Sequence, residues 1–211
     1  MANVKANGKK SRSELRTISR PAMLVDGSDE AFRDLIHDLM AYTHHLAACR
    51  DGFGAIIGLT GVQYEIFMIV RRFGAAADAR LVARVGNANT GNARPGGITV
   101  GHVAARLHRS GAFTTIEAAK LVERGVLKKS TDPADGRKVL LALTPAGEAL
   151  ARTLVPYQQQ VNDVLFEHFD RRRFEALSAL ARELVASGDR GVALSGFLVA
   201  QVTQQQAARA A

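Results

Sequence analysis

The chain has 211 residues, 47% of them apolar and 23% charged, with no tryptophan and a formal net charge of +8. That length suffices for one buried core with appended elements and is too short for two large domains with independent functions. Cys49 is the only cysteine, which excludes an intramolecular disulfide and favours the cytoplasm over an oxidising compartment.

Residues 1–28 are predicted to form a flexible basic tail. The first 20 residues contain six lysines and arginines against Glu14 alone, so they carry +5 of the net charge of +8. Such a tail attracts polyanions, usually nucleic acid, although a solvated tail without a partner is the alternative. It lacks the apolar stretch of a signal peptide, and no later segment reaches the roughly 20 apolar residues that span a bilayer. We therefore expect a cytoplasmic protein with no membrane partner.

Two amphipathic helices are predicted next. The first spans 29–50, and Asp51-Gly52 is expected to stop it. Its apolar side carries Phe32, Leu35, Ile36, Leu39 and Leu46. The second helix opens at Thr60, because Thr60 and Gln63 have the spacing of a capping box. Its apolar side carries Ile66, Phe67, Ile69, Val70 and Phe73.

An insertion over 75–97 separates these helices from the next ones. The composition of residues 87–97 predicts a loop, whereas residues 75–85 are compatible with either a helix or a linker. Thr99 and Ser110 are the predicted caps of two further helices, over 99–107 and 110–124, and Gly125 ends the second. Two helices joined by such a tight turn predict a helix-turn-helix.

A β-hairpin is predicted after the helix-turn-helix. Its strands, 126–129 and 139–143, are β-prone, and turn formers lie between them. Thr144-Pro145 then starts a long helix through about Phe169, with Pro156 as a candidate kink. A last amphipathic helix runs from Asp170 to Gly188, and a weaker helical pattern continues into a C-terminal extension, 188–211. The predicted fold class is mainly α with a small β-hairpin wing, that is, a winged helix-turn-helix.

Particular residues make this winged helix resemble one family. Ser110–Gly125 runs into Asp132-Pro-Ala-Asp-Gly-Arg137, and Leu143-Thr-Pro-Ala-Gly147 follows. This arrangement resembles the MarR family of bacterial regulators, over 59–73 and 98–150.

The resemblance implies a homodimer with a winged-helix core over 59–144, paired through dimerisation helices such as 29–50 and 145–187. It implies a repressor that binds a pseudo-palindromic operator in double-stranded DNA and is released by a small aromatic or phenolic ligand. No cofactor is implied, and no catalytic arrangement of residues is visible, so no enzyme activity is expected. A non-specific architectural nucleic-acid-binding protein is the alternative, and an enzyme with an appended winged helix is a third possibility.

The N-terminal part of the second helix of a helix-turn-helix faces base edges in the major groove. The residues predicted there have few bidentate donors and are Ser110, Ala112, Phe113, Thr115 and Ile116. That set favours hydroxyl and thymine-methyl contacts together with readout of DNA shape. Burial of Phe113 and Ile116 in the core is the alternative. Thr99, the cap of the preceding helix, is counted with the DNA-binding residues.

Arg137 lies just past the predicted hairpin tip, where a long cationic side chain can enter a narrow minor groove. Asp135 is placed to orient its guanidinium by a charge-assisted bond, with an ordinary solvated ion pair as the alternative. Family members often carry further arginines in this wing, whereas this chain has Ala134 and Gly136. The predicted phosphate contacts, which position the protein without specifying sequence, are Arg109, Lys120, Lys128, Lys129 and Lys138.

A ligand cavity between the dimerisation helices and the winged helix is predicted on helix-position grounds only. Its lining would be Tyr42, His45, Phe67 and Arg71, with core packing as the alternative. His45 and Cys49 lie one helical turn apart, near His37 and His44, but no carboxylate pattern accompanies them, so no metal site is predicted. The glycines over 52–58 resemble a dinucleotide fingerprint, but their spacing is wrong and they follow a helix.

Overall fold

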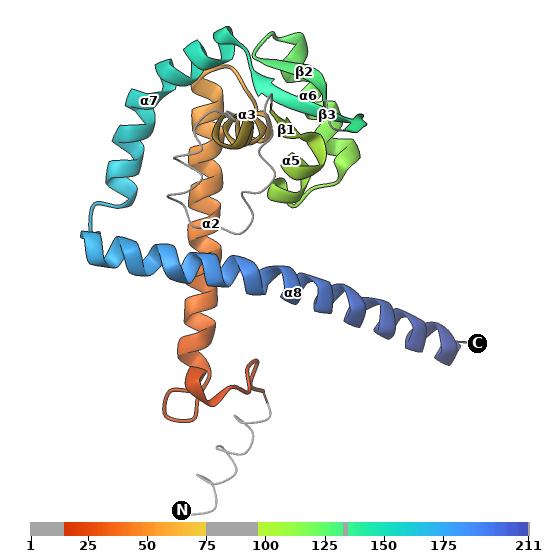
Figure 1. Ribbon diagram of the computed structural model, residues 1–211. Helices are drawn as coiled ribbons and strands as arrows, with labels where there is room; N and C mark the ends of the chain where they lie inside the picture. The colour runs from red at the N-terminus through yellow and green to blue at the C-terminus, as the bar shows by residue number, and fades with distance from the viewer. Residues whose placement is uncertain (1–14, 75–96, 133–134, 211) are drawn as a thin grey trace, which may run out of the picture. The chain divides into compact units, whose positions relative to one another are not determined.

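The computed structural model describes residues 15–74, 97–132 and 135–210 (Figure 1). The chain divides into two units, Met1–Gln159 and Gln160–Ala211, and each is described by itself. The elements are, in chain order, η1 (Pro21–Met23), α2 (Glu30–Ile56), α3 (Gly61–Gly74), β1 (Ile98–Thr99), α5 (Val100–Leu107), α6 (Gly111–Glu123), β2 (Leu127–Asp132), β3 (Asp135–Leu143), α7 (Pro145–Leu165) and α8 (Arg171–Ala210). The predictions for residues 1–14, for nearly all of the 75–97 insertion and for Ala134 lie outside the described residues.

Helix α3 forms the centre of the first unit. It contacts α2, α5, α6 and the strands β1 and β3. Its residues Ile66, Phe67 and Val70 have no exposed surface, and α6, β3 and α7 contribute further fully buried side chains. Each such aliphatic or aromatic side chain contributes about 1.5–3 kcal/mol by its burial. The core therefore extends from the predicted winged-helix region into the end of α2 and the first half of α7, and the helix-turn-helix packs on it.

Helix α2 is longer than predicted, because it continues through Gly52 to Ile56. Phe53 is buried, and its ring lies 5.8 Å from the ring of Tyr64 on α3. One glycine inside a helix costs about 1 kcal/mol relative to alanine, which this packing offsets. The helix ends before Gly58, whose φ of +68° is the left-handed conformation that glycine adopts readily. The prediction that Asp51-Gly52 stops the helix was therefore wrong.

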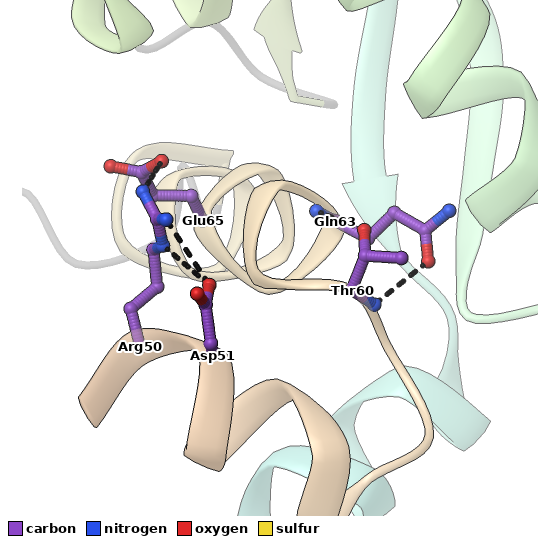
Figure 2. A network of polar contacts seen from close by, with 5 residues as sticks. All are labelled: Arg50, Asp51, Thr60, Gln63 and Glu65. Carbon is purple, nitrogen blue, oxygen red and sulfur yellow. Dashed lines mark hydrogen bonds and ion pairs between the residues drawn. The ribbon is translucent and has the colours of Figure 1, made fainter. Parts of the chain in front are cut away.

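The predicted helix caps are confirmed. At the start of α3, the Thr60 amide donates to Gln63 Oε1 (3.2 Å) and the Gln63 amide donates to Thr60 Oγ1 (3.3 Å), as Figure 2 shows in part. Thr99 Oγ1 accepts from the His102 amide, and Ser110 Oγ accepts from the Phe113 amide, both at 3.2 Å. These bonds satisfy amides that the first turn of a helix leaves without a partner.

The small sheet has three antiparallel strands in the order β1-β3-β2, rather than the hairpin alone. The hairpin is confirmed, with Leu127 opposite Leu143, and both strands are longer than predicted. Strand β1 pairs Ile98 with Leu141 and Thr99 with Leu140. Two residues are too few to show the alternation by which a strand is recognised in a sequence, so β1 was missed.

Helix α7 begins as predicted, with Pro145 in its first turn and Thr144 Oγ1 accepting from the Gly147 amide (3.0 Å). It ends at Leu165, earlier than predicted, and Pro156 lies inside it. In the second half of α7, Gln158 Nε2 donates to the Tyr64 hydroxyl (2.8 Å). This bond fastens the part of α7 that belongs to the first unit onto α3.

Helix α8 is one continuous helix of 40 residues. Asp170 caps it, since its Oδ1 accepts from the Arg173 amide (2.7 Å). The prediction that Gly188 ends this helix was wrong: Gly188 does not adopt the left-handed conformation of a helix terminus, and the C-terminal extension continues the same helix. None of the residues 160–209 is buried. Over the described residues, no single helix is long and apolar enough to span a membrane. The consecutive helices α2 and α3 reach the required length and apolar composition only when they are taken together, and they are bent by 85° relative to each other.

Candidate DNA-binding surface

Helix α6 has a buried face and an exposed face. Thr114, Ala118 and Leu121 have no exposed surface and fasten the helix to the core. Phe113 and Ile116 are 38% and 59% exposed, so their predicted alternative as core residues is wrong. The other predicted base contacts, Ser110, Ala112 and Thr115, are also exposed. The exposed face near the N-terminus of α6 is therefore available to a partner.

The hydroxyls of this face are already engaged with the helix backbone. Ser110 Oγ accepts the capping bond from the Phe113 amide, and Thr115 Oγ1 donates to the Gly111 carbonyl (2.8 Å). A hydroxyl oxygen has two lone pairs, so each can still accept a further hydrogen bond. The surface offered by α6 is thus mainly apolar, with a few hydrogen-bonding oxygens.

The tip of the wing is basic and held by one carboxylate. Asp135 Oδ1 lies 3.5 Å from Arg137 Nε and accepts a bond from the Arg137 amide (3.2 Å), while Oδ2 lies 3.0 Å from Lys138 Nζ. The hydrogen bond from Lys138, followed by that from the Arg137 amide, keeps the pKa of Asp135 below its usual value. Arg137 is 95% exposed, so its guanidinium is open to solvent although Nε lies near Asp135.

A hollow of about 360 Å³ joins the wing to the two helices of the helix-turn-helix. It is lined by Thr99, Val100, Gly101, Thr115, Lys129, Arg137, Lys138 and Val139. Five predicted DNA-binding residues, three of them cationic, thus meet around one concave surface. Its walls come from the first turn of α5, the start of α6 and the facing strands of the wing.

Lys128 and Lys129 lie on different faces of the wing. Lys129 lines the hollow beside α6, whereas Lys128 lines a second hollow of about 170 Å³ together with Arg71 and Glu148. Successive side chains of a strand point to opposite faces, so the strand period accounts for this separation. Of the two neighbouring phosphate contacts predicted on β2, only Lys129 lies with Arg137 and Lys138. Arg109 is exposed in the turn between α5 and α6.

The four residues predicted to line a ligand cavity occupy different surroundings. Phe67 has no exposed surface and belongs to the core, which was the stated alternative. Arg71 lines the second hollow, while Tyr42 is half-buried and His45 exposed on α2. Across the described ranges, no group of three or more His, Cys, Asp or Glu side chains could hold a metal ion.

A polar bridge between α3 and α6 was missed in the sequence. Gln63 Nε2 donates to Glu117 Oε2 (3.1 Å), and Lys120 Nζ lies 2.6 Å from Glu117 Oε1. A second tie joins the guanidinium of Arg124, at the end of α6, to the carbonyl of Gly58. The capping box singled out Gln63, but no local signal identifies a partner 54 residues away. The turn between α2 and α3 therefore contacts the helix that carries the candidate base contacts.

The fold is shared with solved transcriptional regulators. A MarR transcriptional regulator from Methanosarcina mazei Go1 is 19% identical, with 74% of this chain and 98% of that chain covered and a TM-score of 0.52. The transcriptional regulator PA4135 is 17% identical, over 70% and 93% of the two chains, with a TM-score of 0.52. The S. aureus MepR–DNA complex is 14% identical, over 72% and 96%, with a TM-score of 0.51.

No family model matches this sequence, and no curated protein matches it either. At 14–19% identity, the structural likeness establishes the fold. The chain has the winged-helix fold of MarR transcriptional regulators, and it is longer than these relatives, because nearly all of each is covered by about three quarters of this chain.

Proposed function

We propose that this protein is a sequence-specific, DNA-binding transcriptional regulator. The observation that carries the proposal is the concave surface where the exposed start of α6 meets Lys129, Arg137 and Lys138 of the wing. The exposed face of α6 is mainly apolar and has cations beside it. Such a surface can contact both parts of a DNA duplex, the bases in a groove and the phosphates on either side of them. The likeness in fold to regulators, one of them solved as a DNA complex, supports the same proposal.

In this proposal α6 enters the major groove, which is about 12 Å wide and admits one helix. Phe113 and Ile116 contact thymine methyl groups, while Ser110 and Thr115 accept hydrogen bonds from base edges. Arg137 enters the adjacent minor groove, where a narrow groove concentrates negative potential. Lys129, Lys138 and Arg109 contact phosphates and set the register of the protein on the duplex.

The protein acts as a homodimer in this proposal, and a second copy of the chain covers its exposed apolar helix faces. A helix 40 residues long with none of its residues 171–209 buried gains little from tertiary packing within its own chain. Helix α8 exposes Phe174, Leu177, Leu180 and Leu184, and α2 exposes Leu35, Ile36, Leu39, Met40 and Leu46. Pairing two copies through these faces, within 29–50 and 145–187, presents two α6 helices to a pseudo-palindrome with half-sites about 34–36 Å apart.

The finer part of the proposal is repression that a small aromatic or phenolic acid relieves. Arg71 and Lys128 place two cations beside Glu148 at the second hollow, where a ligand carboxylate could pair with a cation, whereas Tyr42 and His45 do not line this hollow. Release requires that the ligand bind better to a state whose α6 helices are wrongly spaced for DNA. By linkage, DNA must then weaken ligand binding by the same factor.

A footprint on genomic DNA fragments separates this proposal from a non-specific architectural protein. A regulator protects a short palindromic stretch and leaves the flanking DNA open to cleavage. Uniform protection that grows with protein concentration would contradict the proposal and favour the architectural alternative. Titration of a protected fragment with aromatic acids then tests the ligand, since an effector must weaken operator binding by roughly 5–150-fold.

A further inference from the structure

Glu117 occupies a partly buried position in the middle of α6, with 13% of its side chain exposed. Its two carboxylate oxygens have different partners: Oε2 accepts from Gln63 Nε2 at 3.1 Å, and Oε1 lies 2.6 Å from Lys120 Nζ. The Glu117 carboxylate therefore connects Gln63 of α3 with Lys120 of α6, the helix proposed to enter the major groove.

The orientation of Gln63 is fixed by the capping box. Its Oε1 accepts from the Thr60 amide, as Figure 2 shows, so its NH₂ group must point away from Thr60. That NH₂ group requires an acceptor, because Gln63 is only 7% exposed. Glu117 supplies the acceptor, and the start of α3 thereby holds the Glu117 carboxylate in place.

Glu117 is ionised at neutral pH. The hydrogen bond from Lys120 is the largest influence and keeps the pKa of Glu117 below its usual value; the bond from Gln63 acts in the same direction. Lys120 is 51% exposed, and its ammonium nitrogen lies 2.6 Å from Glu117 Oε1, so the charge of Lys120 is paired within α6.

The charge balance of α6 differs from that of the wing. Helix α6 carries Glu117, Glu123 and Lys120, a net charge of −1, in a chain whose net charge is +8. The described strands β2 and β3 carry four lysines and arginines against two aspartates, a net charge of +2. Attraction to phosphates that does not depend on sequence thus comes from the wing and not from the helix that meets the bases.

We propose that Glu117 keeps the charge of Lys120 from DNA phosphates while it positions α6 on α3, and so limits the affinity of α6 for DNA of any sequence. This inference rests on the proposed function, since it concerns the same DNA surface. Its consequence is that Lys120, although placed on the reading helix, adds nothing to binding of random sequence. Operator binding then depends on the fit of α6 to the groove rather than on the charge of the helix.

Three variants test this inference: Glu117→Gln, Lys120→Gln and the double variant. Glutamine at 117 keeps an oxygen for Gln63 but frees Lys120. We expect Glu117→Gln to steepen the salt dependence of binding to a random-sequence duplex by about 0.9 in log–log slope, one added phosphate contact. Lys120→Gln leaves the slope of the parent unchanged, and the double variant returns to it. The affinity for the random-sequence duplex rises in Glu117→Gln alone, because only this variant gains a phosphate contact.

Glu123→Gln is the matched control, because it removes one carboxylate from the same helix without freeing Lys120, and its slope should equal that of the parent. Thermal unfolding of each variant shows whether Glu117→Gln keeps the parent's stability. A slope that falls by about 0.9 in Lys120→Gln, with no change in Glu117→Gln, would overturn the inference, since Lys120 would already contact a phosphate. If the parent prefers no sequence at all, the proposed function fails, whatever the slopes of the variants.

Discussion

The two units of the chain differ in how their helices are stabilised. In the first unit, α3 carries fully buried Ile66, Phe67 and Val70, and its start is closed by a reciprocal cap. In the second unit, α8 runs for 40 residues, and none of the residues 160–209 is buried. A helix at the centre of a core is stabilised within its own unit, whereas a long helix with no buried side chain depends on another surface. We therefore expect that folding of the first unit and the proposed pairing of α8 with a second copy are separable properties.

The largest effect should come from emptying the core of the first unit. Phe67→Ala removes a ring with no exposed surface and is expected to cost about 3–5 kcal/mol of unfolding free energy. Leu184→Ala, on a side chain that is 56% exposed, should change the unfolding free energy of dilute protein by less than about 0.5 kcal/mol. Chemical denaturation at low protein concentration measures both. Equal losses in the two variants would show that the units do not differ in this way.

The next effect concerns association rather than folding. Leu184→Asp places a charge on the exposed apolar face of α8, and we expect it to weaken dimerisation at least tenfold, about 1.4 kcal/mol, because a charge buried without a partner is costly. Sedimentation equilibrium over a range of concentrations gives the dimer dissociation constant. Glu183→Gln, a neighbouring exposed change, is the control. An unchanged constant for Leu184→Asp would mean that a second copy does not cover this face.

An effect of comparable size is expected at the tip of the wing, on DNA binding instead of association. Arg137→Ala removes a side chain that is 95% exposed, so we predict a loss of about 1–3 kcal/mol in operator binding with little change in stability. Lys128→Ala, on the opposite face of the same sheet, should leave operator binding nearly unchanged. Gel-shift titrations provide both values. Equal operator affinity for Arg137→Ala and the parent removes the wing from the DNA surface.

The smallest effect is a pH dependence within the first unit. Asp29 is 3% exposed, and it accepts bonds from the Thr17 amide (2.7 Å) and the Thr17 hydroxyl (2.9 Å). The amide bond is the main reason that the pKa of Asp29 lies below its ordinary value of 3.8. A depressed carboxyl pKa stabilises the folded state above the unfolded value, and this contribution disappears as the pH falls through the folded pKa.

Asp29→Asn should therefore be less stable than the parent near neutral pH, and the difference should shrink below about pH 4. Thermal unfolding of the two proteins across this range measures the difference. A gap between parent and variant that stays constant down to the lowest pH would show that the Asp29 charge does not fasten Thr17 to the start of α2.

Local signals predicted the parts of the fold that depend on local contacts. The caps at Thr60, Thr99 and Ser110 each join residues three positions apart, so a short stretch of sequence contains both partners. The exposed apolar face of α6 could likewise be placed once Ser110 had marked the helix start.

Features that rest on distant partners could not be predicted. Helix α2 continues past Gly52 because Phe53 packs with Tyr64, and β1 exists because Ile98 meets Leu141. The bond from Gln63 to Glu117 joins residues 54 positions apart. The placement of Lys128 and Lys129 on opposite faces of the wing could have been predicted from the sequence, because neighbouring side chains of a strand point to opposite faces.

Selection of binding sites from a pool of random duplexes by the full chain is the most direct test of a dimeric, sequence-specific regulator. We expect enrichment of one short pseudo-palindrome whose half-sites are centred about 34–36 Å, or one helical turn, apart. The enriched site should lose affinity in Arg137→Ala but not in Lys128→Ala. Recovery of duplexes with no shared sequence, at affinities equal to those of the starting pool, would contradict the account.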